Sequence, residues 1–121
     1  MGQLPTDLPG LDVQRGLRQC GGREALYHAL LRLYVQHNAG FGDQVRAALQ
    51  RGDYAAAERM AHTLKGSSSQ VGAESVEQPA ADLEAALRAQ APQQDVQAVL
   101  DRLEPPLSRL LAALAPHLPG D

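Results

Sequence analysis

Aromatic residues are scarce in this 121-residue chain, which has no tryptophan, one phenylalanine and three tyrosines. Strand-rich domains draw on aromatic and β-branched side chains, so the scarcity argues against a β-sandwich or a β-barrel. Cysteine is nearly absent as well, because Cys20 stands alone. A single cysteine excludes an internal disulfide and is compatible with a reducing compartment.

The chain also lacks long apolar runs and a strong charge of either sign. No run approaches the roughly 20 apolar residues of a membrane-spanning helix, and no signal-peptide pattern opens the sequence. The formal net charge is −3 and the isoelectric point is near 5.7, so no overall charge attracts nucleic acid or an anionic membrane. Lysine is scarce too, since ten of the eleven basic residues are arginines and the one lysine is Lys65.

Alanine and leucine are abundant and together supply about a third of the residues. A chain of this length can bury a core without disulfides or metals. Apolar residues at helical spacing predict helices over 11–19, 23–37, 43–52 and 53–71, a helix carrying Val76 to Leu87, and a last helix carrying Val96 to Leu114. The sequence therefore predicts an all-α fold, an antiparallel four-helix bundle with a short additional N-terminal helix.

The predicted bundle domain covers residues 11–118. Residues 1–10 contain two glycines and two prolines and show no period, so we interpret them as a linker or as a remnant of cloning. A linker favours a domain that was excised from, or is tethered to, a longer protein over a free-standing one. Both alternatives stay open.

Local signals predict where the first helices begin and end and which of their faces are buried. Asp43 and Asp53 are predicted N-caps of their helices. Gly72 is predicted to adopt the left-handed conformation where the 53–71 helix stops. Over residues 23–37 the apolar stripe is so broad that we expect this helix to be buried on more than one side.

Prolines complicate the last two helices. Ser75 and Gln78 have the spacing of a capping box, but Pro79 would then lack a required N–H, so the helix begins either there or at Pro79. The final apolar stripe stays in phase across Pro105-Pro106. That phase predicts one long, kinked helix and not two separately oriented ones.

One segment breaks the helical preferences. His62, Lys65, Gly66 and Ser69 follow the spacing i, i+3, i+4 and i+7, so they share one face of a helix at the edge of its buried stripe. A glycine in a helix interior costs roughly 1 kcal/mol relative to alanine. The simplest reason to accept this cost at Gly66 is clearance for something bulky that must approach His62.

Lys65 fits the same demand, because its flexible ammonium can swing over the imidazole of His62. A phosphoryl group on that ring would gain charge-assisted hydrogen bonds from the lysine. The spacing does not indicate a metal site, because Glu58 is the one other potential ligand three or four residues from His62. The segment therefore describes an exposed nucleophile with a charge partner. His28, His37 and His117 have no comparable surroundings.

The run His62-Thr63-Leu64-Lys65-Gly66, followed by Val71-Gly72-Ala73, resembles the signature of histidine-containing phosphotransfer (HPt) domains of bacterial multistep phosphorelays. The resemblance covers roughly residues 8–115, with similar segments at Leu8-Pro9-Gly10-Leu11-Asp12, Arg51-Gly52-Asp53-Tyr54 and Asp82-Leu83-Glu84. The chain departs from the family at Gln78-Pro79, where the helix is normally unbroken, and at Ser67-Ser68-Ser69, where small apolar residues are common.

The resemblance implies a role for each residue of this face. His62 would accept the phosphoryl group through Nε2, Lys65 would stabilise its oxygens, and Gly66 would admit the partner. Because Ser69 shares this face, we expect the partner to bind over it as well. The family usually holds the other ring nitrogen with a Gln or Glu of the next helix, and Glu84 is the matching residue. Helix geometry independently places His62 and Glu84 within roughly 3 Å of the same height on antiparallel helices.

The function that the resemblance implies is that of a phosphocarrier and not of an independent enzyme. His62 would take a phosphoryl group from the aspartate of one receiver domain and pass it to the aspartate of a response regulator. Mg²⁺ would sit on the receiver, and the chain itself would need no cofactor or metal. Expected partners are receivers and, where the chain is part of one, a hybrid sensor kinase. We expect a cytoplasmic monomer that contacts neither nucleic acid nor membrane.

Two other readings of the function stay open. The domain is also similar to the phosphoacceptor substrate module of a chemotaxis-type histidine kinase, in which the donor is an ATP-bound kinase domain. The third alternative is a helical interaction module whose histidine is not phosphorylated. Transfer from a receiver, against transfer from an ATP-bound kinase domain, would decide between the first two, and labelling by phosphorylated receivers would exclude the third.

Overall fold

A computed structural model describes residues 8–118 of the chain. Its helices are α1 (Val13–Gln19), α2 (Glu24–Asn38), α3 (Phe41–Gln50), α4 (Tyr54–Val71), α5 (Glu74–Arg88) and α6 (Gln93–Leu114), followed by the short 3₁₀ helix η1 (Ala115–His117). The described part of the chain contains no strand, so the predicted all-α fold is confirmed. Within it, no helix is long and apolar enough to cross a membrane.

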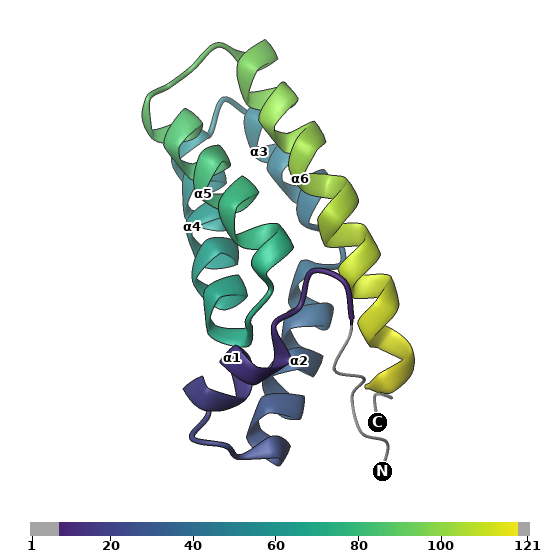
Figure 1. Cartoon of the computed structure of the whole chain (residues 1–121). Helices are drawn as coiled ribbons and strands as arrows, with labels where there is room; N and C mark the ends of the chain where they lie inside the picture. Colours follow the sequence, from purple (N-terminus) through teal and green to yellow (C-terminus); the bar gives the residue numbers. More distant parts are fainter. Residues whose placement is uncertain (1–7, 119–121) are drawn as a thin grey trace.

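The helices form an antiparallel bundle in which α4, α5 and α6 run alternately down and up (Figure 1). The fourth position is shared, because α3 lies beside the upper half of the bundle and α2 beside its lower half, and both contact α4 and α6. Helix α1 lies across the end of the bundle where α4 turns into α5. Five helices, α2 to α6, therefore occupy the four positions of the bundle, and α1 is additional to them.

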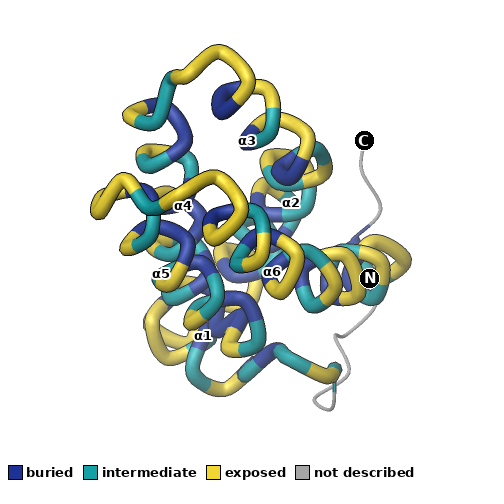
Figure 2. The backbone as a smooth tube through the Cα atoms, turned by 90° about the horizontal axis from the view of Figure 1, so that it is seen from above, coloured by how far each residue is buried: buried dark blue, intermediate teal, exposed yellow. Residues whose placement is uncertain are grey.

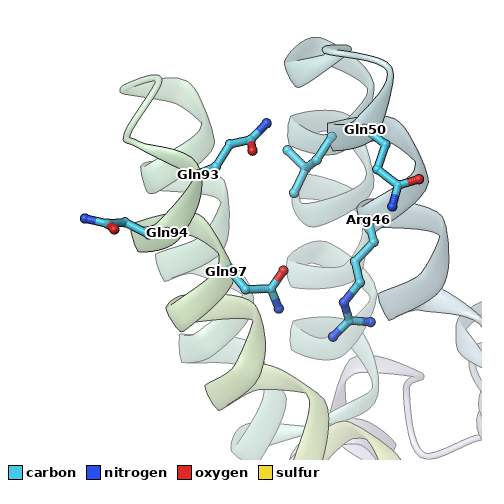
Figure 3. A pocket seen from close by; sticks show the side chains of 6 residues that line it. Arg46, Gln50, Gln93, Gln94 and Gln97 are labelled. Carbon is cyan, nitrogen blue, oxygen red and sulfur yellow. The ribbon is translucent and has the colours of Figure 1, made fainter.

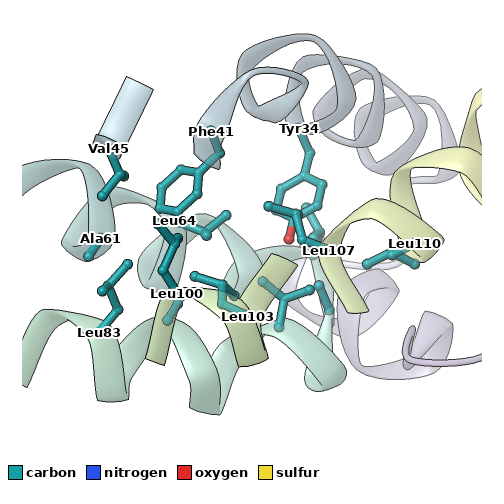
Figure 4. Close-up of a cluster of buried hydrophobic side chains, with 14 of the residues drawn as sticks. Tyr34, Phe41, Val45, Ala61, Leu64, Leu83, Leu100, Leu103, Leu107 and Leu110 are labelled. Atoms are coloured by element: carbon teal, nitrogen blue, oxygen red, sulfur yellow. The ribbon is translucent and has the colours of Figure 1, made fainter. Parts of the chain in front are cut away.

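The core runs along the inside of all these helices, as the buried stretches in Figure 2 show. Helix α6 contributes the stripe that its sequence predicts, namely Val96, Leu100, Leu103, Leu107, Leu110 and Leu114. In Figure 4 the leucines of this stripe face side chains of α2, α3, α4 and α5. The stripe is continuous through Pro105-Pro106, so the prediction of one long helix is confirmed.

The ends of α4 also follow the prediction. The carboxylate of Asp53 accepts a hydrogen bond from the backbone N–H of Ala56 at 3.0 Å, which caps the helix. Gly72 ends it at φ +81°, and a Cβ there would lie 2.3 Å from the carbonyl oxygen of Asp12. Both the left-handed backbone and this close approach require glycine. The short turn brings α5 back antiparallel to α4.

The predicted N-cap at Asp43 is wrong. Helix α3 begins at Phe41 after an N-cap at Gly40, and Asp43 lies within its first turn. Phe41 and Val45 are both buried in the core. Burial of the Phe41 ring therefore moves the N-cap three residues toward the N-terminus, from Asp43 to Gly40, and tertiary packing outweighs the capping preference.

The prediction that α2 is buried on more than one side is also wrong. Its buried residues are Tyr27, Leu31 and Tyr34, whereas Leu26 and Leu33 are exposed. The two tyrosines fix the face, because Tyr27 donates to the carbonyl of Val71 at 2.8 Å and Tyr34 pairs with a serine hydroxyl of α4. Helix α2 packs through this one face at the edge of the bundle.

Neither predicted start of α5 is correct. The helix begins at Glu74, directly after the α4–α5 turn, and Pro79 lies inside it. Val76 and Ala80 are fully buried against the neighbouring helices. Packing of these two side chains keeps the first turns helical even though Pro79 offers no N–H.

Residues 1–7 of the predicted linker lie outside the described residues. Its last residues contact the bundle: Leu8 packs against the core, and the carbonyl of Gly10 accepts a hydrogen bond from the N–H of Ser75 at 3.2 Å. The boundary between linker and domain stays a prediction.

Candidate functional site

The part of the predicted α4 face that carries His62 and Lys65 lies beside α5. His62 and Lys65 project from α4, while Glu84 and Arg88 project from α5, which returns antiparallel after the turn at Gly72. These four residues and Glu58, one turn before His62 on α4, are called the His62 cluster below. The antiparallel register therefore joins residues that are 22 positions apart in the chain.

Glu84 is the centre of the His62 cluster. Its Oε2 lies 2.7 Å from Nδ1 of His62, and its Oε1 lies 2.7 Å from Nζ of Lys65. Arg88 donates from Nη2 to the same Oε2 at 2.8 Å. The Glu84 side chain is only 4% exposed. A buried carboxylate needs hydrogen-bond partners, and these three donors supply them.

The charges around Glu84 keep it ionised. The hydrogen bond from Lys65 lowers the pKa of the Glu84 carboxyl most, burial opposes this shift, and the hydrogen bond with His62 adds to the lowering. An ionised carboxylate only accepts hydrogen bonds, so Nδ1 of His62 must be the donor. In the neutral ring the lone pair then lies on Nε2.

The rest of the His62 ring faces outward. Its side chain is 67% exposed, although one nitrogen is held by a buried group. Among the described residues, His62 is the histidine whose ring takes part in a hydrogen bond; His28, His37 and His117 make none. The site thus presents an oriented imidazole at the surface.

Gly66 lies on the same exposed face, one turn after His62. A Cβ at this position would meet no heavy atom of the chain within 4 Å. Nothing within the described chain therefore requires glycine there. Glycine in a helix interior lowers stability. A partner that docks on this face would explain why a small residue is kept there.

Ser69 is not free on this face. Its hydroxyl accepts a hydrogen bond from Nη2 of Arg15 at 3.0 Å, and its carbonyl accepts one from the Gln19 side chain at 2.8 Å. Both partners belong to α1. Ser69 therefore ties α1 to α4 at the edge of the face.

The structure also explains the serine run that departs from the family. The Ser67 hydroxyl donates to the carbonyl of Leu64 in its own helix at 3.2 Å. Ser68 is fully buried, and its hydroxyl pairs with that of Tyr34 at 2.7 Å. With Ser69 bound to Arg15, each serine has its own partner, and Ser68 in particular matches a buried tyrosine hydroxyl.

Sequence reasoning missed Arg88 entirely and saw Glu58 only as an isolated acid. Arg88 donates to Glu84 and also, from Nε, to Oε2 of Glu58 at 3.2 Å. The signal for Arg88 was present, because it follows Glu84 by four residues and such pairs meet on one helix face. The link to Glu58 on α4 required the register of the two helices.

A groove of about 340 Å³ lies elsewhere, between α3 and α6, and is lined by glutamines, Arg46 and Leu49 (Figure 3). None of its lining residues belongs to α4 or α5, so it is separate from the His62 cluster. Its one ionisable side chain, Arg46, is already paired with Glu104. In the described residues no three His, Cys, Asp or Glu side chains gather as metal ligands do.

Comparison with protein-family models matches residues 29–115 to the Hpt domain. A search of curated proteins and a search of solved structures found no match. Hpt domains transfer phosphoryl groups through a histidine in phosphorelay signalling, interact with receiver domains, and are phosphocarriers without independent catalytic activity. The matched residues make up well over half of the chain and include the whole of α3, α4, α5 and α6, so the chain belongs to the Hpt domain family.

Proposed function

We propose that His62 is the residue on which this Hpt domain carries its phosphoryl group. The observation that carries the proposal is the hydrogen bond of 2.7 Å between Nδ1 and the buried, ionised Glu84, which leaves Nε2 as the nucleophilic atom of an exposed ring. The other histidines of the described chain have no such orienting partner. This hydrogen bond therefore distinguishes His62 from the other three histidines of the chain.

The proposed transfer moves the phosphoryl group from a receiver aspartate to Nε2 of His62. The lone pair of Nε2 forms a bond to phosphorus, the P–O bond to the receiver aspartate breaks, and the aspartate leaves as a carboxylate. Because Nδ1 keeps its proton, the phosphorylated ring carries a positive charge. The carboxylate of Glu84 offsets this charge, which favours a Glu over a neutral Gln at this position.

Lys65 and Gly66 serve the approach and the charge of the phosphoryl group. The ammonium of Lys65 lies on Glu84, one turn from the ring, and its flexible stem lets it turn toward phosphoryl oxygens at Nε2. Gly66 leaves the space over this face open for a receiver. Ser69 borders the face through its bonds to α1, so α1 forms one rim of the docking surface.

We propose that the donor and the acceptor are receiver aspartates and that the domain acts as a monomer in the cytoplasm, over residues 11–118. The receiver supplies the Mg²⁺ and most of the charge stabilisation. The chemotaxis-type alternative differs in its donor. Phosphorylation by an isolated kinase domain with ATP, but not by a phosphorylated receiver, would favour that alternative.

The test is His62→Gln, with His117→Gln as the matched control. After incubation with a phosphorylated receiver, the wild type and the control should acquire acid-labile, base-stable phosphate, and His62→Gln should acquire none. Circular dichroism should show the same helix content in all three. Normal labelling of His62→Gln would refute the assignment. Absence of labelling in every protein, both by the receiver and by a kinase domain with ATP, would favour the interaction-module alternative.

A further inference from the structure

The Glu84 carboxylate has more partners than the transfer reaction needs. Lys65 occupies Oε1, while Nδ1 of His62 and Nη2 of Arg88 share Oε2. Arg88 is itself oriented from the other side, because its Nε donates to Glu58 at 3.2 Å. Two cations thus anchor a single buried carboxylate in the unphosphorylated protein.

These two anchors differ in what they can do next. Lys65 lies one turn from His62 and is the cation that the proposed function moves to the phosphoryl oxygens. When it leaves, Oε1 loses its partner, and the Glu84 side chain regains the freedom to rotate away from Nδ1. Arg88 has no such second task, since its guanidinium spans Glu84 on α5 and Glu58 on α4.

We propose that Arg88 is a positioning residue that, held by Glu58, keeps Glu84 on Nδ1 of His62 while Lys65 turns to the phosphoryl group. The proposal rests on the assignment of His62 as the phosphoacceptor. A guanidinium suits this role because its planar fork binds two carboxylates in a fixed geometry, which the single ammonium of a lysine does not. In the unphosphorylated protein the two anchors are redundant; in the phosphorylated protein only Arg88 remains.

The experiment measures how well the Nδ1 proton of His62 is protected, by NMR of the ¹⁵N-labelled ring, in the unphosphorylated and the phosphorylated protein. The variants are Arg88→Ala, Lys65→Ala, the double variant and Arg88→Lys. Arg102→Ala, at an exposed position of α6, is the matched control. The side chain of Arg88 is 66% exposed, so its removal leaves no buried cavity.

We expect Arg88→Ala to leave the unphosphorylated ring unchanged but to speed exchange of the Nδ1 proton about tenfold after phosphorylation, as loss of a hydrogen bond to a charged group would. The unphosphorylated ring should lose its protection only in the double variant. Arg88→Lys should restore part of the protection. Equal exchange in phosphorylated Arg88→Ala and wild type would overturn the proposal, as would an equal effect on both forms.

The role of Glu58 is tested by Glu58→Gln, alone and together with Arg88→Ala. Because Glu58 acts through Arg88, its substitution should speed exchange in the phosphorylated protein but add nothing in the Arg88→Ala background. Equal effects in both backgrounds would contradict this part. Failure of the wild type to label at His62 would refute the proposed function itself, whereas normal labelling with unaltered exchange in Arg88→Ala would refute only the inference about Arg88.

Discussion

Two glycines of the α4 region have opposite reasons for being glycine. Gly72 has a left-handed backbone and lies against the carbonyl of Asp12, so its requirement is internal to the fold. Gly66 sits in the middle of a helix with open space around it, so the fold gains nothing from it. At the residue scale, the same side chain therefore marks structure in one place and docking in the other.

Substitution by alanine should separate the two roles. Gly66→Ala should stabilise the protein by about 0.5–1 kcal/mol, because alanine is the better helix former, yet slow transfer from a receiver about tenfold or more through misplaced docking. Gly72→Ala should destabilise it by more than about 1 kcal/mol, since alanine is strained at positive φ and meets Asp12. Chemical denaturation measures the change in stability, and single-turnover transfer from a phosphorylated receiver measures the change in rate. A transfer rate unaffected in Gly66→Ala would contradict the clearance argument.

Because of Glu84, the free energy of unfolding of the domain should depend on pH. Its pKa is lowered in the folded protein, chiefly by Lys65, so its ionised form stabilises the fold above the ordinary value of 4.5. This contribution is lost as the pH falls through the lowered folded value. Urea denaturation should therefore show Glu84→Gln less stable than wild type at pH 7, with the gap narrowing below about pH 4.5. Glu24→Gln, at an exposed position of α2, controls for the loss of one charge, and a gap that does not narrow would count against the ion pair.

At the element scale, α1 is held to the bundle by a small set of polar bonds. Arg15 bridges Glu77 on α5 and Ser69 on α4, at 2.9 and 3.0 Å. The Arg15 bond lowers the pKa of the Glu77 carboxyl, which keeps this partner ionised. Gly16 adds a close approach, since a Cβ there would lie 2.3 Å from the ring of Tyr27. A helix of seven residues is not stable alone, so these contacts, together with the burial of Val13 in the core, decide whether α1 forms.

Arg15→Ala should loosen α1 and leave the rest of the bundle intact. Amide hydrogen exchange should become faster over residues 13–19 but stay unchanged in the middle of α4 and α6, because local openings need not involve the core. Arg18→Ala, at an exposed position of the same helix, is the control. Uniformly faster exchange would mean that Arg15 stabilises the whole domain and not α1 alone.

At the scale of the whole molecule, one core unites the helices, and the leucine stripe of α6 is its longest continuous part. The His62 cluster sits on the opposite surface of α4 and α5, supported by this core but not part of it. Exposed side chains of this cluster, such as His62, can therefore change with little effect on stability, whereas the core and the buried Glu84 cannot.

Leu103→Ala tests this separation. Leu103 is fully buried, so the substitution should cost about 2–5 kcal/mol of unfolding free energy through lost burial and the cavity left behind. Leu33→Ala on the exposed face of α2 should cost no more than about 0.5 kcal/mol. At a temperature where both variants stay folded, transfer to His62 should match the wild type. Similar losses of stability in the two variants would contradict the placement of Leu103 in the core and of Leu33 at the surface.

The sequence by itself determined the helical class, the buried stripe of α6, the Asp53 cap, the stop at Gly72 and the residues facing out around His62. These depend on local spacing and on conformations that few residues adopt, which a single sequence carries. The antiparallel turn at Gly72 even predicted that His62 and Glu84 would meet, because helix rise is constant.

Only the tertiary structure decided where packing overrides local preference. The start of α3 at Phe41, the start of α5 at Glu74 and the single buried face of α2 all follow from which side chains the core accepts, and no local signal carries that information. The same holds for the link from Arg88 to Glu58, because their pairing depends on how two helices are rotated against each other. Spacing placed His62 and Lys65 on one face and predicted their meeting with Glu84, and packing added Arg88 and its link to Glu58.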